Sequence, residues 1–165
     1  LEYFVESALL LKASRVFFLI VGEGEKLNEL KVFAKRAELD NILFLPKIAK
    51  NQVSGVIKKL DVCFIGWRVT TLYDYGIAPN KIPEYLISGK PVLHSFSGPN
   101  DPISLAGAGV TVRAEDPAAI ADAILALEAS SVDELEAMGA RGRKYAISHY
   151  SYESIAQKLA EEIMA

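Results

Sequence analysis

The sequence has a single cysteine, no strongly basic stretch and no long apolar run. Cys63 has no disulfide partner within the chain, and its place in the apolar segment DVCFIG predicts a small buried side chain. The net charge of −3 argues against nucleic acid as the main partner, because phosphate backbones bind basic surfaces. No apolar run approaches the ~20 residues of a membrane-spanning helix. These absences favour a cytoplasmic protein, with the inner face of a membrane as the alternative location.

Two familiar nucleotide-binding motifs are incomplete. Gly22 and Gly24 begin a GxGxxG pattern, but the third glycine is absent. The next expected strand ends in Pro46 and Lys47 rather than in the acidic residue of an NAD site. The segment SGKP, 88–91, lacks the Ser or Thr that follows a P-loop lysine. No Cys/His spacing indicates a metal site, and no GxSxG motif indicates a hydrolase.

Short apolar runs alternate with segments of helical periodicity along the whole chain. Apolar runs of this kind suit strands that are buried on both faces, and their alternation with helices predicts a parallel sheet wrapped by helices. At 165 residues the chain predicts one α/β domain with a Rossmann-like, doubly wound sheet. The expected strands are 15–22, 41–46, 61–66, 91–96 and 110–113, and the expected helices are 1–12, 25–40, 51–60, 80–88, 101–109, 116–129, 132–147 and 151–164.

The carboxyl ends of the strands are the expected ligand-binding edge of such a sheet. The longest loop at that edge, 67–79, contains Trp67, Tyr73 and Tyr75, which can stack on a base or sugar or simply pack in the core. The helix that follows begins with Asn80 and Lys81.

The start of this helix predicts an anion site. Amide groups at a helix N-terminus suit a phosphate, and a cation such as Lys81 is unfavourable there unless an anion lies nearby. Glu84, one turn beyond Asn80, can accept two hydrogen bonds from vicinal hydroxyls, as on a ribose. A capping Asn80 with a solvated Lys81 and Glu84 is the competing interpretation.

Six segments in order resemble the C-terminal, donor-binding half of a group 1 glycosyltransferase of the GT-B fold. They are FLIVGEGEKLNELK, NILFLPKI, DVCFIG, NKIPEYLISGKPV, AGAGVTVRAEDPAAIADAI and YAISHYSYESIAQKL. The segment GIAPNKIPEYLISGKPV is similar to a bacterial branch that builds cell-surface polysaccharide, including fucosaminyltransferase-like proteins. The resemblance implies a retaining transferase with a nucleotide-sugar donor, expected to be a UDP-sugar, no cofactor and no required metal.

The resemblance also implies roles for individual residues. Glu84 would hold the nucleotide ribose, and the segment at Lys47 and Ile48 would hold the base. The diphosphate would meet backbone amides near the helix entry, and candidates for the donor-sugar loop follow the first and fourth expected strands. The diphosphate candidates are Gly76, Ile77, Asn80 and Lys81, and the donor-loop candidates are Gly22, Glu23, Gly24 and Asp101.

Two departures from the family pattern are visible. The Glu-x7-Glu pattern would place its first glutamate at position 76, which is Gly76, with Asp74 nearby but out of register. A Gly-Gly-x-x-Glu-like loop is replaced by SGPND, which makes Asp101 a possible substitute. A nonhydrolysing UDP-sugar 2-epimerase-like domain and a non-catalytic nucleotide-binding module therefore stay open as alternatives.

Leu1 corresponds to the helix that follows the family's first strand. The resemblance thus implies that residues 1–165 are one nucleotide-sugar-binding domain, a fragment of a longer enzyme, without its acceptor domain and without the first strand. In the strand order 3-2-1-4-5-6 that strand lies between 15–22 and 61–66. The fragment alone is expected to bind nucleotide weakly and transfer no sugar. Any association with a membrane surface would come through the N-terminal acceptor domain, the other half of such an enzyme.

Overall fold

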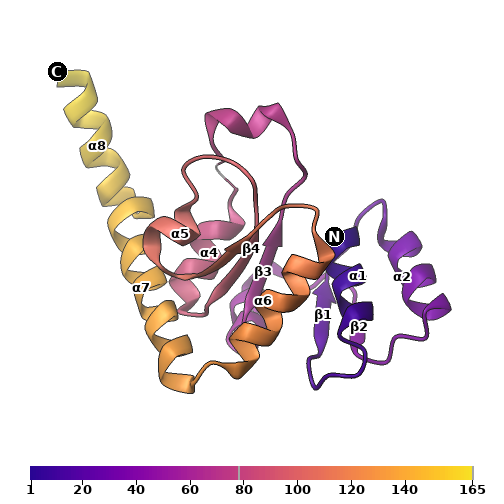
Figure 1. Ribbon diagram of the computed structural model, residues 1–165. Helices are drawn as coiled ribbons and strands as arrows, with labels where there is room; N and C mark the ends of the chain where they lie inside the picture. Colours follow the sequence, from indigo (N-terminus) through magenta and orange to yellow (C-terminus); the bar gives the residue numbers. More distant parts are fainter. Residues whose placement is uncertain (78, 165) are drawn as a thin grey trace.

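The computed structural model, which describes residues 1–77 and 79–164, is an α/β structure (Figure 1). All the expected helices and strands are present, and each strand has four residues. The strands are β1 (Phe18–Val21), β2 (Ile42–Leu45), β3 (Cys63–Gly66), β4 (Val92–Ser95) and β5 (Gly109–Val112). The helices are α1 (Glu2–Leu10), α2 (Leu27–Arg36), α3 (Lys50–Ile57), α4 (Lys81–Ser88), α5 (Pro102–Ala106), α6 (Pro117–Ala129), α7 (Val132–Tyr150) and α8 (Tyr152–Met164), and a 3₁₀ helix, η1, spans Thr71–Tyr75.

The structure differs from the sequence-based expectation in the loop 67–79 and at the end of the helix expected over 101–109. The loop 67–79 contains η1, which the sequence did not predict. The helix expected over 101–109 ends at Ala106, because Gly107 takes a left-handed conformation with φ of 59°. Gly109 does not close a helix but begins β5, where its missing side chain lets its backbone approach β4 closely.

The strands form two parallel sheets. β1 pairs with β2, while β3, β4 and β5 pair in that order. Among residues 1–77 and 79–164, β1 and β3 are not hydrogen-bonded to each other. The parallel α/β class predicted from the sequence is confirmed. The separation of β1 from β3 is consistent with the strand order expected from the family resemblance, in which these two strands are not neighbours.

Aromatic side chains bridge the space between the two sheets. The ring of Phe4, on α1, stacks on Phe64 of β3 at 4.0 Å between centroids. The same ring meets Phe18 of β1 edge-on at 5.0 Å. Helix α1 therefore links β1 to β3 through side-chain packing rather than through backbone pairing.

Helices cover both faces of the β3–β4–β5 sheet, with α6 on one face and α4, α5 and α7 on the other (Figure 1). Neighbouring strand residues point to opposite faces, as the pleat requires: Val92 packs with Leu86 of α4, whereas Leu93 packs with Ile120 of α6. Cys63 is buried on the α4 face, and its burial raises the pKa of the thiol to about 12. None of the helices in the described part of the chain combines the length and apolarity that a membrane crossing needs.

Candidate functional site

A cleft of about 430 Å³ lies between the two sheets, where β1 and β3 end. Its lining joins the turn after β1, the start of the loop after β3, the N-terminal turn of α1 and the first residue of α4. Apolar side chains of β1, β3, α2 and α6 form most of the rest of it. The lining includes two glycines, Gly22 and Gly24, and the polar or aromatic residues Glu2, Glu23, Lys26, Trp67, Arg68, Tyr73 and Lys81. This is the edge at which the sequence predicted a ligand.

The turn after β1 is open to the cleft and is connected to the loop after β2. Gly22 has a φ of 146°, and an added side-chain atom at Gly22 or Gly24 would meet nothing within 4 Å. Space beside these backbone groups is therefore free. The Glu23 carboxylate accepts a hydrogen bond from Lys47 Nζ at 2.6 Å, and this bond raises the pKa of Lys47.

Three cations surround the cleft. Lys26 donates a hydrogen bond to Glu2 Oε1, and this bond is the main reason that the pKa of Glu2 falls to about 2. Arg68 Nη2 lies 3.5 Å from the same oxygen, and Lys81 lines the cleft as well. Sequence reasoning found Lys81 but missed Lys26 and Arg68, although both lie in loops at the ligand-binding edge. Lys26 and Arg68 thus share one carboxylate oxygen of Glu2, and the position between these two cations suits an anion.

The entry of α4 differs from the expected arrangement. Asn80 makes no side-chain cap and has helical dihedral angles, so the competing interpretation of Asn80 as a capping residue is wrong. The Ile82 amide donates to Pro79 O at 3.2 Å, and Pro83 has no amide hydrogen. The candidate donors in this turn are therefore the amides of Asn80 and Lys81.

The cleft brings together only some of the residues that the sequence singled out. Lys81 joins the donor-loop candidates Gly22, Glu23 and Gly24 in its lining. Glu84 is exposed on α4, outside that lining. The candidates Asn80, Gly76, Ile77, Lys47, Ile48 and Asp101 also lie outside it.

Gly76 explains one departure from the family pattern. It follows η1 with a φ of 102°, a backbone conformation that glycine adopts freely and a glutamate would adopt only with strain. The loop in this form therefore excludes a glutamate at position 76. Asp74, in η1, is exposed.

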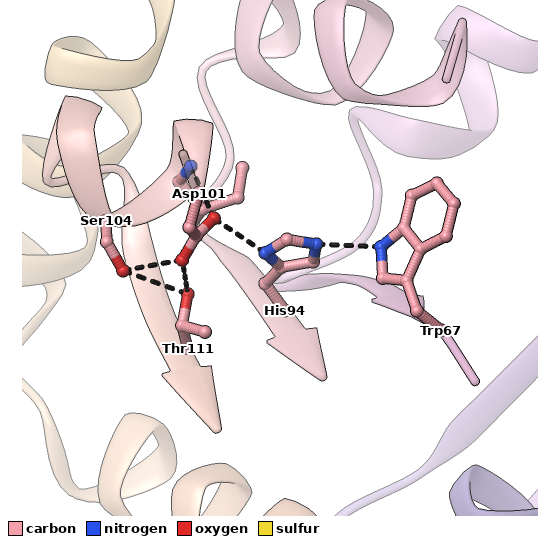
Figure 2. A network of polar contacts seen from close by, with 6 residues as sticks. Trp67, His94, Asp101, Ser104 and Thr111 are labelled. Atoms are coloured by element: carbon pink, nitrogen blue, oxygen red, sulfur yellow. Dashed lines mark hydrogen bonds and ion pairs between the residues drawn. The ribbon is translucent and has the colours of Figure 1, made fainter. Parts of the chain in front are cut away.

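Asp101 is engaged entirely within the protein (Figure 2). Its Oδ1 accepts hydrogen bonds from His94 Nδ1 at 2.7 Å and from the Ile103 amide at 3.0 Å. Its Oδ2 accepts from the hydroxyls of Ser104, at 2.6 Å, and Thr111. Burial alone would raise the pKa of Asp101, but the bonds from His94, Ser104 and Thr111 outweigh it and hold the pKa well below the ordinary value. These four bonds argue against Asp101 as a donor-sugar contact.

His94 connects Asp101 to the cleft. Its side chain is completely buried, and its Nε2 accepts a hydrogen bond from Trp67 Nε1 at 2.8 Å. Since an indole N–H can only donate, Nε2 carries no proton, and Nδ1 donates its own to Asp101. This arrangement fixes His94 as the neutral Nδ1–H tautomer. No local sequence pattern indicates the bond, because Trp67 and His94 are 27 residues apart.

No group of three or more His, Cys, Asp or Glu side chains within residues 1–77 and 79–164 is placed to hold a metal ion. Glu2 and Glu23, the acidic residues at the cleft, are paired with cations. The cleft thus offers positive charge and backbone amides, which suit an anionic ligand.

The fold matches solved glycosyltransferases. HepE of Anabaena, solved in complex with UDP, superposes with a TM-score of 0.80 at 16% identity, over 98% of this chain and 44% of that chain. A mutant of S. aureus TarM, solved with Fondaparinux, alpha-GlcNAc-glycerol and UDP, gives a TM-score of 0.75 at 23% identity, over 96% and 31% of the two chains. WaaG, a glycosyltransferase involved in lipopolysaccharide biosynthesis, gives 0.68 at 18% identity, over 87% and 38%.

The chain thus spans less than half the length of each of these solved structures. Comparison with curated protein sequences finds no match. A model of the family described as glycosyl transferases group 1 matches residues 1–130, most of the chain. The α/β fold with parallel sheets agrees with the Rossmann-like domains of GT-B glycosyltransferases. The chain belongs to the group 1 glycosyl transferases.

Proposed function

We propose that this chain is the donor-binding half of a retaining glycosyltransferase that moves a sugar from a nucleotide-sugar to a glycan or lipid-linked acceptor. The observation that carries the proposal is the cleft, where Lys26, Arg68 and Lys81 surround open backbone at Gly22 and Gly24. A diphosphate is the part of a nucleotide-sugar that needs such a positive site. The UDP in the HepE and TarM structures supports a UDP-sugar as the donor.

The diphosphate would replace the Glu2 carboxylate between Lys26 and Arg68. The Lys81 side chain and the amides of Asn80 and Lys81 at the entry of α4 would complete its contacts, together with the Ile77 amide. The Gly76 amide already donates to Tyr73 O at 3.0 Å, so Gly76 would contribute through its backbone conformation. Charge-assisted hydrogen bonds from lysine and arginine to phosphate are among the strong ones. As the sugar leaves, these groups would stabilise the growing charge on the diphosphate.

The remaining roles follow the family resemblance. Glu84 would hold the ribose hydroxyls, and Lys47 with Ile48 would meet the base. The ion pair between Lys47 and Glu23 supports a base site next to the turn after β1, because it joins the two loops.

The acceptor would be held by a second domain of a longer enzyme. This part of the proposal is supported by the share of the solved structures that the chain spans. A role in bacterial cell-surface polysaccharide is supported by the likeness to WaaG, a glycosyltransferase involved in lipopolysaccharide biosynthesis. A place at the cytoplasmic face of the membrane belongs to the same proposal and rests on the family resemblance. The isolated chain is expected to bind nucleotide weakly and to transfer no sugar, since positioning the acceptor is a large part of such catalysis.

A thermal-shift panel of UDP-, GDP- and ADP-sugars, run with and without EDTA, tests the proposal. We expect stabilisation by at least one nucleotide-sugar, unchanged in EDTA, because lysine, arginine and amide groups rather than a metal hold the diphosphate. Stabilisation by none of the three classes would contradict the proposed function. A strict requirement for Mg²⁺ or Mn²⁺ would contradict the metal-free site and make Asp74 a candidate ligand.

Replacing Glu84 with alanine is expected to weaken nucleotide binding by about 1.5–3 kcal/mol, the range for hydrogen bonds to a charged group. Stability should change little, because Glu84 is exposed. Calorimetric titration with UDP measures the effect. Glu136→Ala, an exposed glutamate on α7, is the matched control and should bind as the unaltered chain does. Equal affinity of both variants would remove the ribose role from Glu84.

A further inference from the structure

A cluster of aromatic rings lies at the carboxyl end of the β3–β4–β5 sheet, where the loop after β3 begins. Trp67 meets Tyr73 edge-on at 4.9 Å between ring centroids and Phe96 at 6.1 Å. His94 stacks on Phe96 at 4.9 Å. His94 and Phe96 are buried, whereas Trp67 and Tyr73 are only partly buried and line the cleft. The cluster therefore has a buried half and a half that faces the cleft.

A series of hydrogen bonds holds Trp67, one of the two rings that face the cleft. The indole N–H of Trp67 bonds to His94, and His94 in turn bonds to Asp101 (Figure 2). Asp101 is itself held by the Ile103 amide and by the Thr111 hydroxyl. Each polar side-chain group of Trp67, His94 and Asp101 is paired, and His94 is completely buried. A fully satisfied buried network of this kind holds its members in one arrangement.

The bond to His94 also decides what Trp67 can offer a ligand. Its only polar group, the indole N–H, is already used, so the ring itself is what remains for contact. An aromatic ring suits the C–H face of a sugar ring or the flat face of a base. The base candidates Lys47 and Ile48 follow β2, in the other sheet. Trp67 instead follows β3, donates a hydrogen bond to His94 of β4, and lines the cleft together with Lys81.

We infer that Trp67 contacts the sugar ring of the donor, and that His94 is the residue that positions it. This assignment rests on the proposed function, because it requires a nucleotide-sugar in the cleft. Asp101 acts one step further away, by keeping His94 in the tautomer that accepts the indole N–H. The family resemblance made Asp101 a possible substitute in the donor-sugar loop, whereas in this assignment it acts only through His94 and Trp67.

Trp67 is the only tryptophan of the chain, so its fluorescence reports on this contact alone. Titration of the unaltered chain with UDP-glucose is expected to change the emission well beyond the change that UDP causes. Calorimetry should show that Trp67→Ala weakens UDP-glucose binding about fivefold to tenfold, the effect of one aromatic contact, and leaves UDP binding within about twofold. Equal losses for UDP and UDP-glucose, or the same emission change with both, would overturn the assignment.

Two substitutions of His94 separate positioning from simple stability. In His94→Gln the amide oxygen can take the place of Nε2 and accept the indole N–H, whereas the side chain of His94→Asn reaches only as far as Nδ1. We expect the Gln variant to keep the stronger response to UDP-glucose and the Asn variant to lose it, with both folded by circular dichroism. The same response in both folded variants would remove the positioning role. If either fails to fold, the Trp67 measurements decide.

The proposed function and this assignment fail in different ways. If the unaltered chain binds neither UDP nor UDP-glucose, the proposed function is contradicted, and the Trp67 assignment with it. If both bind but Trp67→Ala changes neither affinity, the proposed function survives and only the assignment fails.

Discussion

Gly139→Ala is expected to destabilise the fold by about 3 kcal/mol, at the upper end of the usual effect of overpacking. A side-chain atom added at Gly139, on α7, would lie 1.8 Å from the carbonyl oxygen of Gly89, at the end of α4. The contact would join the Cβ atom of the new alanine to a backbone carbonyl oxygen. Neither atom moves when a side chain changes rotamer, so no rotamer change relieves the contact. Helices α4 and α7 would have to separate, although they bury Leu86 and Ala146 together. Urea unfolding followed by circular dichroism measures the loss.

Gly55→Ala is the matched control, because it makes the same change within another helix. An atom added at Gly55, on α3, would meet nothing within 4 Å, so only the helix preference of alanine remains. We expect a gain of about 0.5–1 kcal/mol. The two substitutions should thus have opposite signs. Equal effects would show that α4 and α7 are not packed as closely as described.

Asp101→Ala is the second substitution with a large expected effect, a loss of about 1.5–5 kcal/mol. Removing the cap of α5 accounts for about 0.5–2 kcal/mol. The N–H of His94 would in addition be left unpaired at a completely buried place, which costs about 1–3 kcal/mol. Thermal or urea unfolding at neutral pH measures the total.

Asp116→Ala provides a control of the same chemistry. Asp116 is also an Asp–Pro cap, and its Oδ1 accepts the Ala119 amide at 3.0 Å. It has no bond to a buried histidine, so we expect its loss to be about 0.5–2 kcal/mol, that of a cap alone. Losses of the same size at Asp101 and Asp116 would contradict an energetic role for the bond to His94.

The pH dependence of Asp101→Ala follows from the lowered pKa of Asp101. Since the folded pKa lies below the ordinary carboxyl value of about 3.9, the ionised group stabilises the fold fully above that pH. The stabilisation is lost as the pH falls further, through the folded pKa. We therefore expect the stability difference between the unaltered chain and Asp101→Ala to be constant near neutral pH and to shrink below about pH 4.

The fold could be predicted from the sequence because local patterns determine most of it. Apolar runs gave the five strands and their parallel order. Asp116 caps α6 as its Asp-Pro pair predicts. Gly89 ends α4 in the left-handed conformation that glycine favours. That β1 and β3 are not paired followed from the strand order together with the family resemblance.

The candidate site was less accessible to sequence reasoning, because tertiary contacts decide its details. Asn80 has a capping side chain but forms no cap, since the backbone at that position is already helical. Lys26 and Arg68 lie 42 positions apart in the sequence and meet only through Glu2. His94 carries no local signal of a role, and its bonds to Trp67 and Asp101 arise only where β3, β4 and α5 pack together.

The central claim, that the cleft between β1 and β3 binds a nucleotide-sugar, can be tested by titrating the ¹⁵N-labelled chain with UDP-glucose and following its amide resonances. The account predicts progressive shifts concentrated at the amides of Gly22, Gly24 and Lys81 and at the indole N–H of Trp67, with α7 unaffected. It also predicts weak binding, with a Kd of about 0.1–1 mM, or about −5 kcal/mol. Shifts confined to surfaces away from the cleft, or no shifts at ligand concentrations well above this range, would contradict it.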